Sequence, residues 1–160
     1  MKNPGTLVRA ELFYEMDVYK HKHAVMRHLS NCAKSLLDRG TYHDDSKLLA
    51  VEYASYVEPV WRLNTEDIEY GSEEYEKITA AMGPGWEHHK DTNDHHPEHH
   101  GGIQGMNLFQ IVEMLCDWIA ASSRNDSDPK KALEFIQDIP GPLKVILSRT
   151  IDAILEMDEE

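Results

Sequence analysis

The hydrophobic positions in the first part of the chain recur at the three- and four-residue steps of an amphipathic α-helix. These positions are Leu12, Met16, Tyr19, Val25, Leu29, Cys32 and Leu36. The pattern predicts one long helix over residues 6–38, with Gly40 as its stop signal. His21 and His28 are seven residues apart. They therefore share one face of this helix, which we expect to be its inner face.

Shorter helices are expected through the middle of the chain, separated by proline, glycine and polar residues. The second helix opens at residues 41–47 and runs to about Tyr56, and Pro59 is expected to end it. The third covers residues 72–82 and is broken by the Gly-Pro-Gly segment at 83–85.

A histidine-rich segment then interrupts the helical pattern. A short helix over 86–91 leads into a loop over 92–105, which is too polar and too rich in glycine and proline for a core element. Asn107 and Gln110 follow with the spacing of a helix capping box. The apolar positions behind this cap are Leu108, Ile111, Val112, Leu115, Ile119 and Ala120. They predict a strongly apolar helix.

The last part of the chain completes a helical protein. Asp128, followed by proline, caps a further helix, and a final helix is expected over 143–157. No segment alternates with the two-residue period of a strand. The sequence therefore predicts an all-α fold, a compact bundle of about five to seven helices. We expect a single domain over residues 1–160, a length that fits one domain.

Charge and hydropathy exclude several classes of function. The 16 basic and 29 acidic residues give a net charge of −13, whereas nucleic-acid binders carry a basic footprint, so duplex nucleic acid is not expected as a partner. No apolar stretch approaches the roughly 20 residues of a membrane span, and the first residues lack a signal peptide. We therefore expect no membrane partner and a cytoplasmic location. The sequence leaves open whether the protein forms a homo-oligomer.

Histidine is the unusual feature of the composition. The chain has ten histidines, and six of them lie between His88 and His100. His43 and Asp44 are adjacent at the expected start of the second helix. An imidazole and a carboxylate placed together can bind one transition-metal ion, or can lie between two.

Charged residues on the apolar helix strengthen the case for a metal. Asp117 is flanked by apolar residues, and a buried carboxylate needs a partner or a metal. Glu113 precedes it by four residues on the same face, and two such carboxylates repel unless a cation or proton lies between them. Lys47 lies one turn beyond the His-Asp pair, where it could reach a phosphate oxygen. Trp86 and Trp118 are interpreted as core residues.

The order His, His-Asp, Asp on successive helices resembles that of HD-domain metal-dependent phosphohydrolases. The likeness is closest to a phage and bacterial branch of that superfamily without an assigned activity. Its motifs are found here as HDDSK at 43–47, YGS at 70–72, HHKDTNDHHPEH at 88–99, MNL at 106–108 and EMLCDW at 113–118. The likeness covers about residues 15 to 150.

The resemblance implies a helical HD-like domain that holds one or two divalent ions, chosen from Mn, Fe, Co, Ni, Zn and Mg. The implied ligands are His21, with His28 as the alternative, together with His43, Asp44 and Asp117. Dinuclear members use extra histidines for a second ion, and the candidates here are His88, His89, His95 and His96. Some of these would instead orient the ligands or bind phosphate.

The same resemblance implies roles in catalysis and substrate binding. Asp44, Lys47 and Glu113 are the catalytic candidates, with Glu113 also able to orient a ligand or transfer a proton. The candidates for contact with substrate are Lys47, Asn93, Glu98, His99 and His28. The implied reaction is hydrolysis of a small phosphate ester or anhydride, with a nucleotide as the expected substrate. Two alternatives remain open, a metal-bearing binding protein without turnover for a nucleotide or host protein, and an HD-type di-iron oxygenase.

Overall fold

The computed structural model describes residues 4–69, 72–123, 127–136 and 139–158. Every regular element in these ranges is helical, which confirms the predicted all-α class. The first two residues of the predicted YGS motif, 70 and 71, lie outside the described part. The chain divides into two compact units, Met1–Thr41 and Tyr42–Glu160, and each is described separately below.

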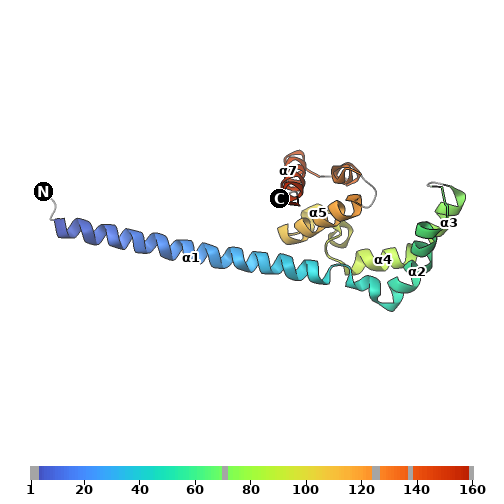
Figure 1. Ribbon diagram of the computed structural model, residues 1–160, viewed down its shortest axis with the longest axis horizontal. Coiled ribbons are helices and arrows are strands. Elements are labelled where there is room, and N and C mark those ends of the chain that lie inside the picture. Colours follow the sequence, from blue (N-terminus) through green and yellow to red (C-terminus); the bar gives the residue numbers. More distant parts are fainter. Residues whose placement is uncertain (1–3, 70–71, 124–126, 137–138, 159–160) are drawn as a thin grey trace. The chain divides into compact units, whose positions relative to one another are not determined.

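The described part of the first unit is the helix α1 (Pro4–Tyr42) except for its last residue, and this helix is unbroken (Figure 1). The expectation that Gly40 ends this helix is wrong. Helical hydrogen bonding continues past Gly40, and Thr41 Oγ1 donates to the carbonyl of Leu37 at 2.8 Å. The backbone turns only at Asp44, whose φ of 59° lies in the left-handed region that aspartate tolerates better than most residues. A candidate metal ligand therefore terminates the helix.

The second unit begins with the 3₁₀ helix η1 (Asp45–Leu48) and continues with α2 (Ala50–Thr65). Pro59 does not end α2, as had been expected, but lies buried inside it. Proline removes one backbone hydrogen bond while keeping a helical φ. Because packing fixes this part of α2 against its neighbours, the helix continues through the proline to Thr65.

Helices α3 (Glu73–Ala81) and α4 (Gly83–Thr92) follow, and α4 packs against α2. Ser72 caps α3, since its Oγ accepts a hydrogen bond from the backbone N–H of Tyr75 at 3.1 Å. The segment 83–85 was expected only to break the third helix. It also forms the first turn of α4. At Gly85 a Cβ atom would lie 2.6 Å from the Cβ of Ser55 on α2. Glycine is therefore required for this close approach of the two helices.

The segment expected to be a polar loop over 92–105 contributes to the interior. It contains the 3₁₀ helices η2 (Pro97–His100) and η3 (Ile103–Gly105). Only 2% of the surface of His95 and 2% of that of Ile103 is exposed. The expectation that this segment forms no core element is wrong, because composition alone does not reveal which side chains of a polar segment the tertiary fold buries.

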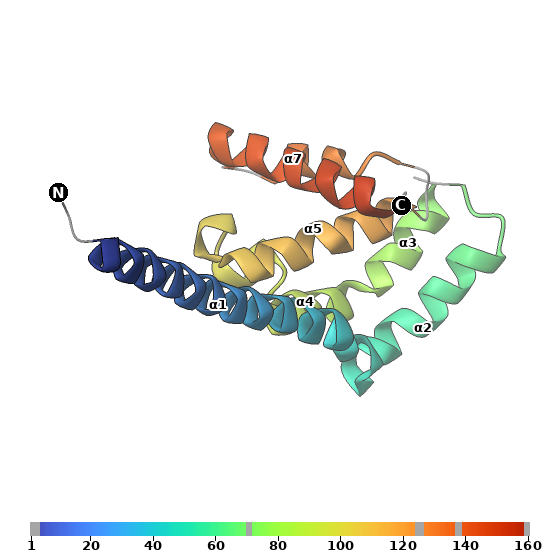
Figure 2. The same cartoon turned by 60° about the vertical axis from the view of Figure 1, so that its left-hand side comes forward.

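The core lies around α5 (Leu108–Ser123) and α7 (Gly141–Asp158), which lie side by side in Figure 2. The predicted capping box is present: the N–H of Asn107 donates to Gln110 Oε1 at 2.8 Å, and the N–H of Gln110 donates to Asn107 Oδ1 at 3.2 Å. Between these helices lie η4 (Pro129–Lys131) and α6 (Ala132–Phe135). The buried residues of this hydrophobic cluster are Ile103, Met106, Ile111, Met114, Leu115, Ile119, Leu133, Leu147 and Ile151.

Among the described residues, no helix combines the length and the apolar character that crossing a membrane requires.

Candidate metal centre

The turn after α1, the end of α4, the segment 93–96 and one face of α5 bring six donor side chains together in the second unit. These are His43, Asp44, His89, His95, His96 and Asp117. They come from segments far apart in the sequence. This convergence depends on the tertiary fold and not on any local motif.

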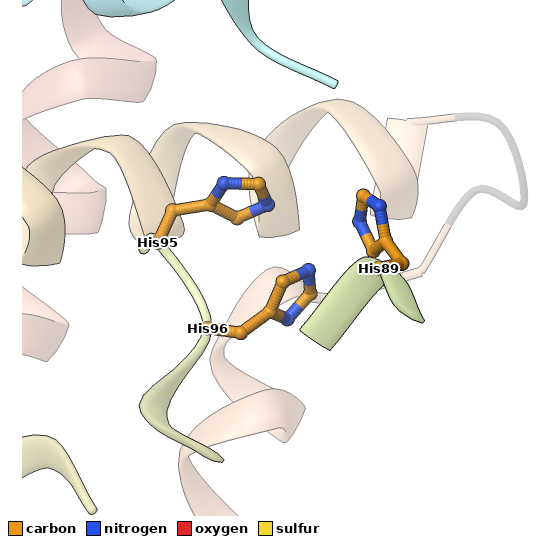
Figure 3. A group of neighbouring side chains, drawn as sticks. All are labelled: His89, His95 and His96. Carbon is orange, nitrogen blue, oxygen red and sulfur yellow. The ribbon is translucent and has the colours of Figure 1, made fainter. Parts of the chain in front are cut away.

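The donors form two overlapping groups in the described part of the chain. His89, His95 and His96 each offer a ring nitrogen, and these three atoms lie within 4.8 Å of one another (Figure 3). His43, His95 and Asp117 form the second group under the same limit. His95 belongs to both groups, and since one ring nitrogen binds one ion, it can serve only one of them at a time.

Asp44 lies between the two groups. Its Oδ1 is 3.2 Å from His89 Nε2 and 3.5 Å from His95 Nε2. Its Oδ2 is 3.5 Å from His43 Nε2 and accepts a hydrogen bond from Lys47 Nζ at 2.5 Å. One carboxylate thus presents an oxygen to each group, which is the arrangement that a ligand shared by two ions requires.

Two glutamates, one buried and one half-buried, contact the Nδ1 atoms of the histidines. Glu113 Oε1 is 2.9 Å from His43 Nδ1 and 3.4 Å from His95 Nδ1. Glu52, which is fully buried, places Oε1 2.7 Å from His88 Nδ1 and Oε2 2.9 Å from His89 Nδ1. An Nδ1–H that donates to a carboxylate leaves the Nε2 lone pair available for a metal. In the neutral imidazoles, the two glutamates therefore favour the tautomer whose Nε2 can bind a metal.

Three buried polar atoms of the cluster have no hydrogen-bond partner among the described residues: Asp44 Oδ1, His95 Nε2 and His96 Nε2. Leaving a buried donor or acceptor unpaired costs about 1–3 kcal/mol, so three in one place require a compensating partner. All three belong to the donor groups described above. A divalent cation would satisfy them together, and the residues present therefore fit a metal ion.

The pKa of His43 shifts in the opposite direction from those of His95 and His96. The hydrogen bond with Asp117, helped by Glu113, outweighs burial and raises the pKa of His43 to about 9. Burial, reinforced by the neighbouring histidines, lowers the pKa of His95 to about 4, and burial also lowers that of His96. At neutral pH, His95 and His96 are ready to bind a metal, whereas His43 must first lose a proton.

Metal uptake is therefore expected to release about one proton per chain at pH 7, and the apparent affinity should rise about tenfold per pH unit from pH 7 to about 9. The sign follows from competition, because a protonated imidazole cannot bind a cation. Calorimetric titration with Zn²⁺ in buffers of different ionisation enthalpy measures the proton release. An affinity that stays constant between pH 7 and 9 would contradict this reading of His43.

The remaining predicted site residues lie around the cluster or outside it. Asn93 donates to Ser46 Oγ at 2.7 Å and to the carbonyl of His89 at 2.9 Å, so it supports the site from within. His88 is held by Glu52, and His99 is exposed with its ring centre 4.8 Å from that of His100.

Two further predicted ligands, His21 and His28, belong to the first unit, where both are exposed on α1. Their convergence with the other ligands stays a prediction. The pair of His43 and Asp117, predicted to share the site, has Nε2 and Oδ1 3.5 Å apart.

Sequence reasoning missed Glu52 and Ser46. Ser46 Oγ donates to Glu52 Oε2 at 3.1 Å, which links the HDDSK motif to the carboxylate that holds His89. A signal was present, because Glu52 stands between Val51 and Tyr53 in a helical segment. The same kind of signal had pointed to Asp117.

A cavity of about 900 Å³ adjoins the cluster. This volume falls in the range of sites for small molecules. Trp86, interpreted from sequence as core, is 43% exposed at its wall, whereas Trp118 does pack against the core. The lining residues are Lys47, Trp86, His89, His96, Pro97, Glu98, Gly101, Gly102, Asp117, Trp118, Ala121, Ala132 and Ile136.

Comparison with known proteins places the chain in a family. No curated protein and no solved structure gives a significant match to it. A family model described as a family of unknown function, DUF5662, matches residues 10–156. That match spans nearly the whole chain and includes every donor of the cluster. The chain therefore belongs to the DUF5662 family.

Proposed function

We propose that this protein is a metal-dependent phosphohydrolase that acts on a small phosphate ester or anhydride, with a nucleotide as the substrate. The observation that carries the proposal is the position of Asp44, with one oxygen facing each of two donor groups at the wall of a ligand-sized cavity. The likeness of the HDDSK and EMLCDW motifs to HD-domain phosphohydrolases supports the same reaction class.

The donor set indicates which ions the site would hold. His89, His95 and His96 with Asp44 would hold one ion, and His43 and Asp117 with Asp44 the other. Imidazole-rich donor sets favour Mn, Fe, Co, Ni or Zn over Mg. When bound, such ions supply Lewis acidity and activate water for attack at phosphorus.

The chain's own groups supply the remaining elements of the proposed mechanism. Lys47 is half exposed, lines the cavity and contacts Asp44. Its ammonium is placed to pair with a phosphoryl oxygen and so to stabilise the charge on it. Glu113 is held against two ring nitrogens of the cluster. In this mechanism it orients His43 and His95, and it is not among the residues that line the cavity.

The test is metal analysis of the purified protein, joined to a phosphate-release screen of nucleotides with Mn²⁺, Co²⁺, Ni²⁺, Zn²⁺ and Mg²⁺. We expect bound transition metal and many turnovers per chain, with Mg²⁺ least effective. Binding without turnover across the screen would indicate a binding protein instead. A tightly bound iron pair with substrate-dependent oxygen uptake would indicate an oxygenase.

The segment 86–105 should become more protected from hydrogen exchange when metal is added at pH 7.5. It carries His89, His95 and His96, and two of these have buried ring nitrogens without a partner. Coordination would tie the end of α4 to the segment at 93–96. Mass spectrometry of exchange with Zn²⁺ and with a chelator measures the effect, and α7 serves as the internal control. Equal exchange in both conditions would rule out a metal-organised segment.

A further inference from the structure

The residues that line the cavity beside the metal cluster include two chemically different sets. Lys47, His89, His96, Glu98 and Asp117 are charged or polar, and we call their part of the wall the polar end. Trp118 and Ala121 on α5, with Ala132 and Ile136 at the two ends of the α6 segment, carry no ionisable group, and we call their part of the wall the apolar end. A phosphate group needs only the polar end. The apolar end therefore has no function in binding phosphate itself.

One helix connects the two ends. Asp117 and Ala121 are four residues apart on α5, so they share a face of that helix, and Trp118 lies between them. One turn of an α-helix advances about 5.4 Å along its axis. The apolar end thus begins one helical turn beyond a ligand of the cluster. A group joined to a phosphate at the cluster would reach it.

The two tryptophans of the cavity differ in what they can offer a ligand. Trp86 contacts the ring of His89, with 6.0 Å between the ring centroids, and Lys90 Nζ lies 5.5 Å from the centre of its ring. It is therefore already partnered. Trp118 packs against the core on one side and lines the cavity on another. The two alanines beside it leave space that larger side chains would fill.

We propose that this apolar end, formed by Trp118, Ala121, Ala132 and Ile136, binds the non-phosphate part of the substrate as a flat aromatic ring, a nucleobase in a nucleotide. Ala121 determines the room available to that ring. The orientation, with phosphate at the cluster, rests on the proposed phosphohydrolase function. An apolar floor with an aromatic side chain accepts a ring face through stacking and burial, which a sugar alone cannot match.

The experiment compares Ala121→Leu with Ala120→Leu. Both alanines are exposed on α5, and leucine is a good helix former, but only Ala121 lines the cavity. Calorimetry measures binding of the four common ribonucleoside 5′-monophosphates and of ribose 5-phosphate at one fixed Mn²⁺ concentration. Phosphate release is measured on the same samples.

In the unmodified protein, at least one nucleotide should bind about tenfold or more tightly than ribose 5-phosphate. Ala121→Leu should lose this advantage while ribose 5-phosphate binds as before, and Ala120→Leu should behave like the unmodified protein. Equal binding of all nucleotides and ribose 5-phosphate, or an Ala121→Leu variant without effect, would overturn the assignment.

The two proposals can fail separately. If nucleotides bind and Ala121→Leu weakens that binding, but no phosphate is released, the proposed hydrolysis is refuted and the proposed apolar subsite stands. Equal release from ribose 5-phosphate and from every nucleotide would refute the subsite and leave hydrolysis.

Discussion

Asp44→Asn is expected to reduce metal-dependent phosphate release by more than about 100-fold while leaving the helical fold intact. Residues that merely orient a metal ligand typically contribute 10–100-fold to affinity or activity, and Asp44 presents one oxygen to each of the two donor groups. Asparagine keeps the shape of the side chain but removes its negative charge. The expected loss therefore comes from weaker metal binding, which calorimetry with Zn²⁺ would detect alongside activity.

Asparagine is the informative substitution because of the backbone at this position. The φ of Asp44 is 59°, and asparagine tolerates left-handed geometry, whereas alanine pays about 1–2 kcal/mol there. Asp45→Asn is the matched control, since Asp45 is the exposed neighbour and belongs to neither donor group. The control should keep full activity. If Asp44→Asn also kept it, the centre described here would not be the site of the reaction.

Glu52→Ala is expected to destabilise the protein by about 3–5 kcal/mol, a loss typical of breaking a buried charged network. Glu52 is fully buried, and both of its oxygens are used, one by His88 and the other by His89 and Ser46. Burial opposes the ionisation of this carboxyl, but these hydrogen bonds outweigh it and lower its pKa. Its contribution to stability is therefore present above the ordinary glutamate pKa and is lost as the pH falls below it.

Urea denaturation with and without Zn²⁺ measures both consequences of changing Glu52. Glu52→Gln keeps the volume but offers one acceptor oxygen in place of two, so it should fold better than Glu52→Ala and still bind metal 10–100-fold more weakly than the unmodified protein. Glu58→Gln, at an exposed position of α2, should change stability by less than about 0.5 kcal/mol. Metal affinity unaffected by Glu52→Gln would show that this carboxylate does not orient His89.

The helices were predictable where local chemistry determines them. The apolar period of α5 and its Asn107–Gln110 cap were readable because both depend on neighbours three or four residues away. The ends of α1 and α2 were not, because Gly40 and Pro59 are only weak breakers when the surrounding structure continues the helix. Their effect depends on packing that single-residue propensities do not contain.

The residue types of the candidate centre could be predicted from the sequence, but the way in which they converge in space could not. The polar Asp117 and Glu113 on an apolar helix stood out, because burial of a carboxylate demands a partner. Which histidines converge could not be read from a stretch where six lie within thirteen residues. His95 and His96 belong to the donor groups, whereas His99 does not. That difference arises from the turns of the backbone at 97–105.

The close approach of Gly85 to Ser55 affects which mutations the protein can tolerate as well as how its helices pack. Glu52 lies three residues before Ser55 on α2, and His88 and His89 lie three and four residues after Gly85 on α4. The hydrogen bonds of Glu52 with these histidines therefore form about one helical turn away from the close approach of Gly85 to Ser55. A single methyl group added at Gly85 would separate the helices and pull the carboxylate from both imidazoles. A position that carries no chemistry of its own is thereby placed under the same selection as the ligands, and a survey of mutations should find it as intolerant as the histidines it never touches.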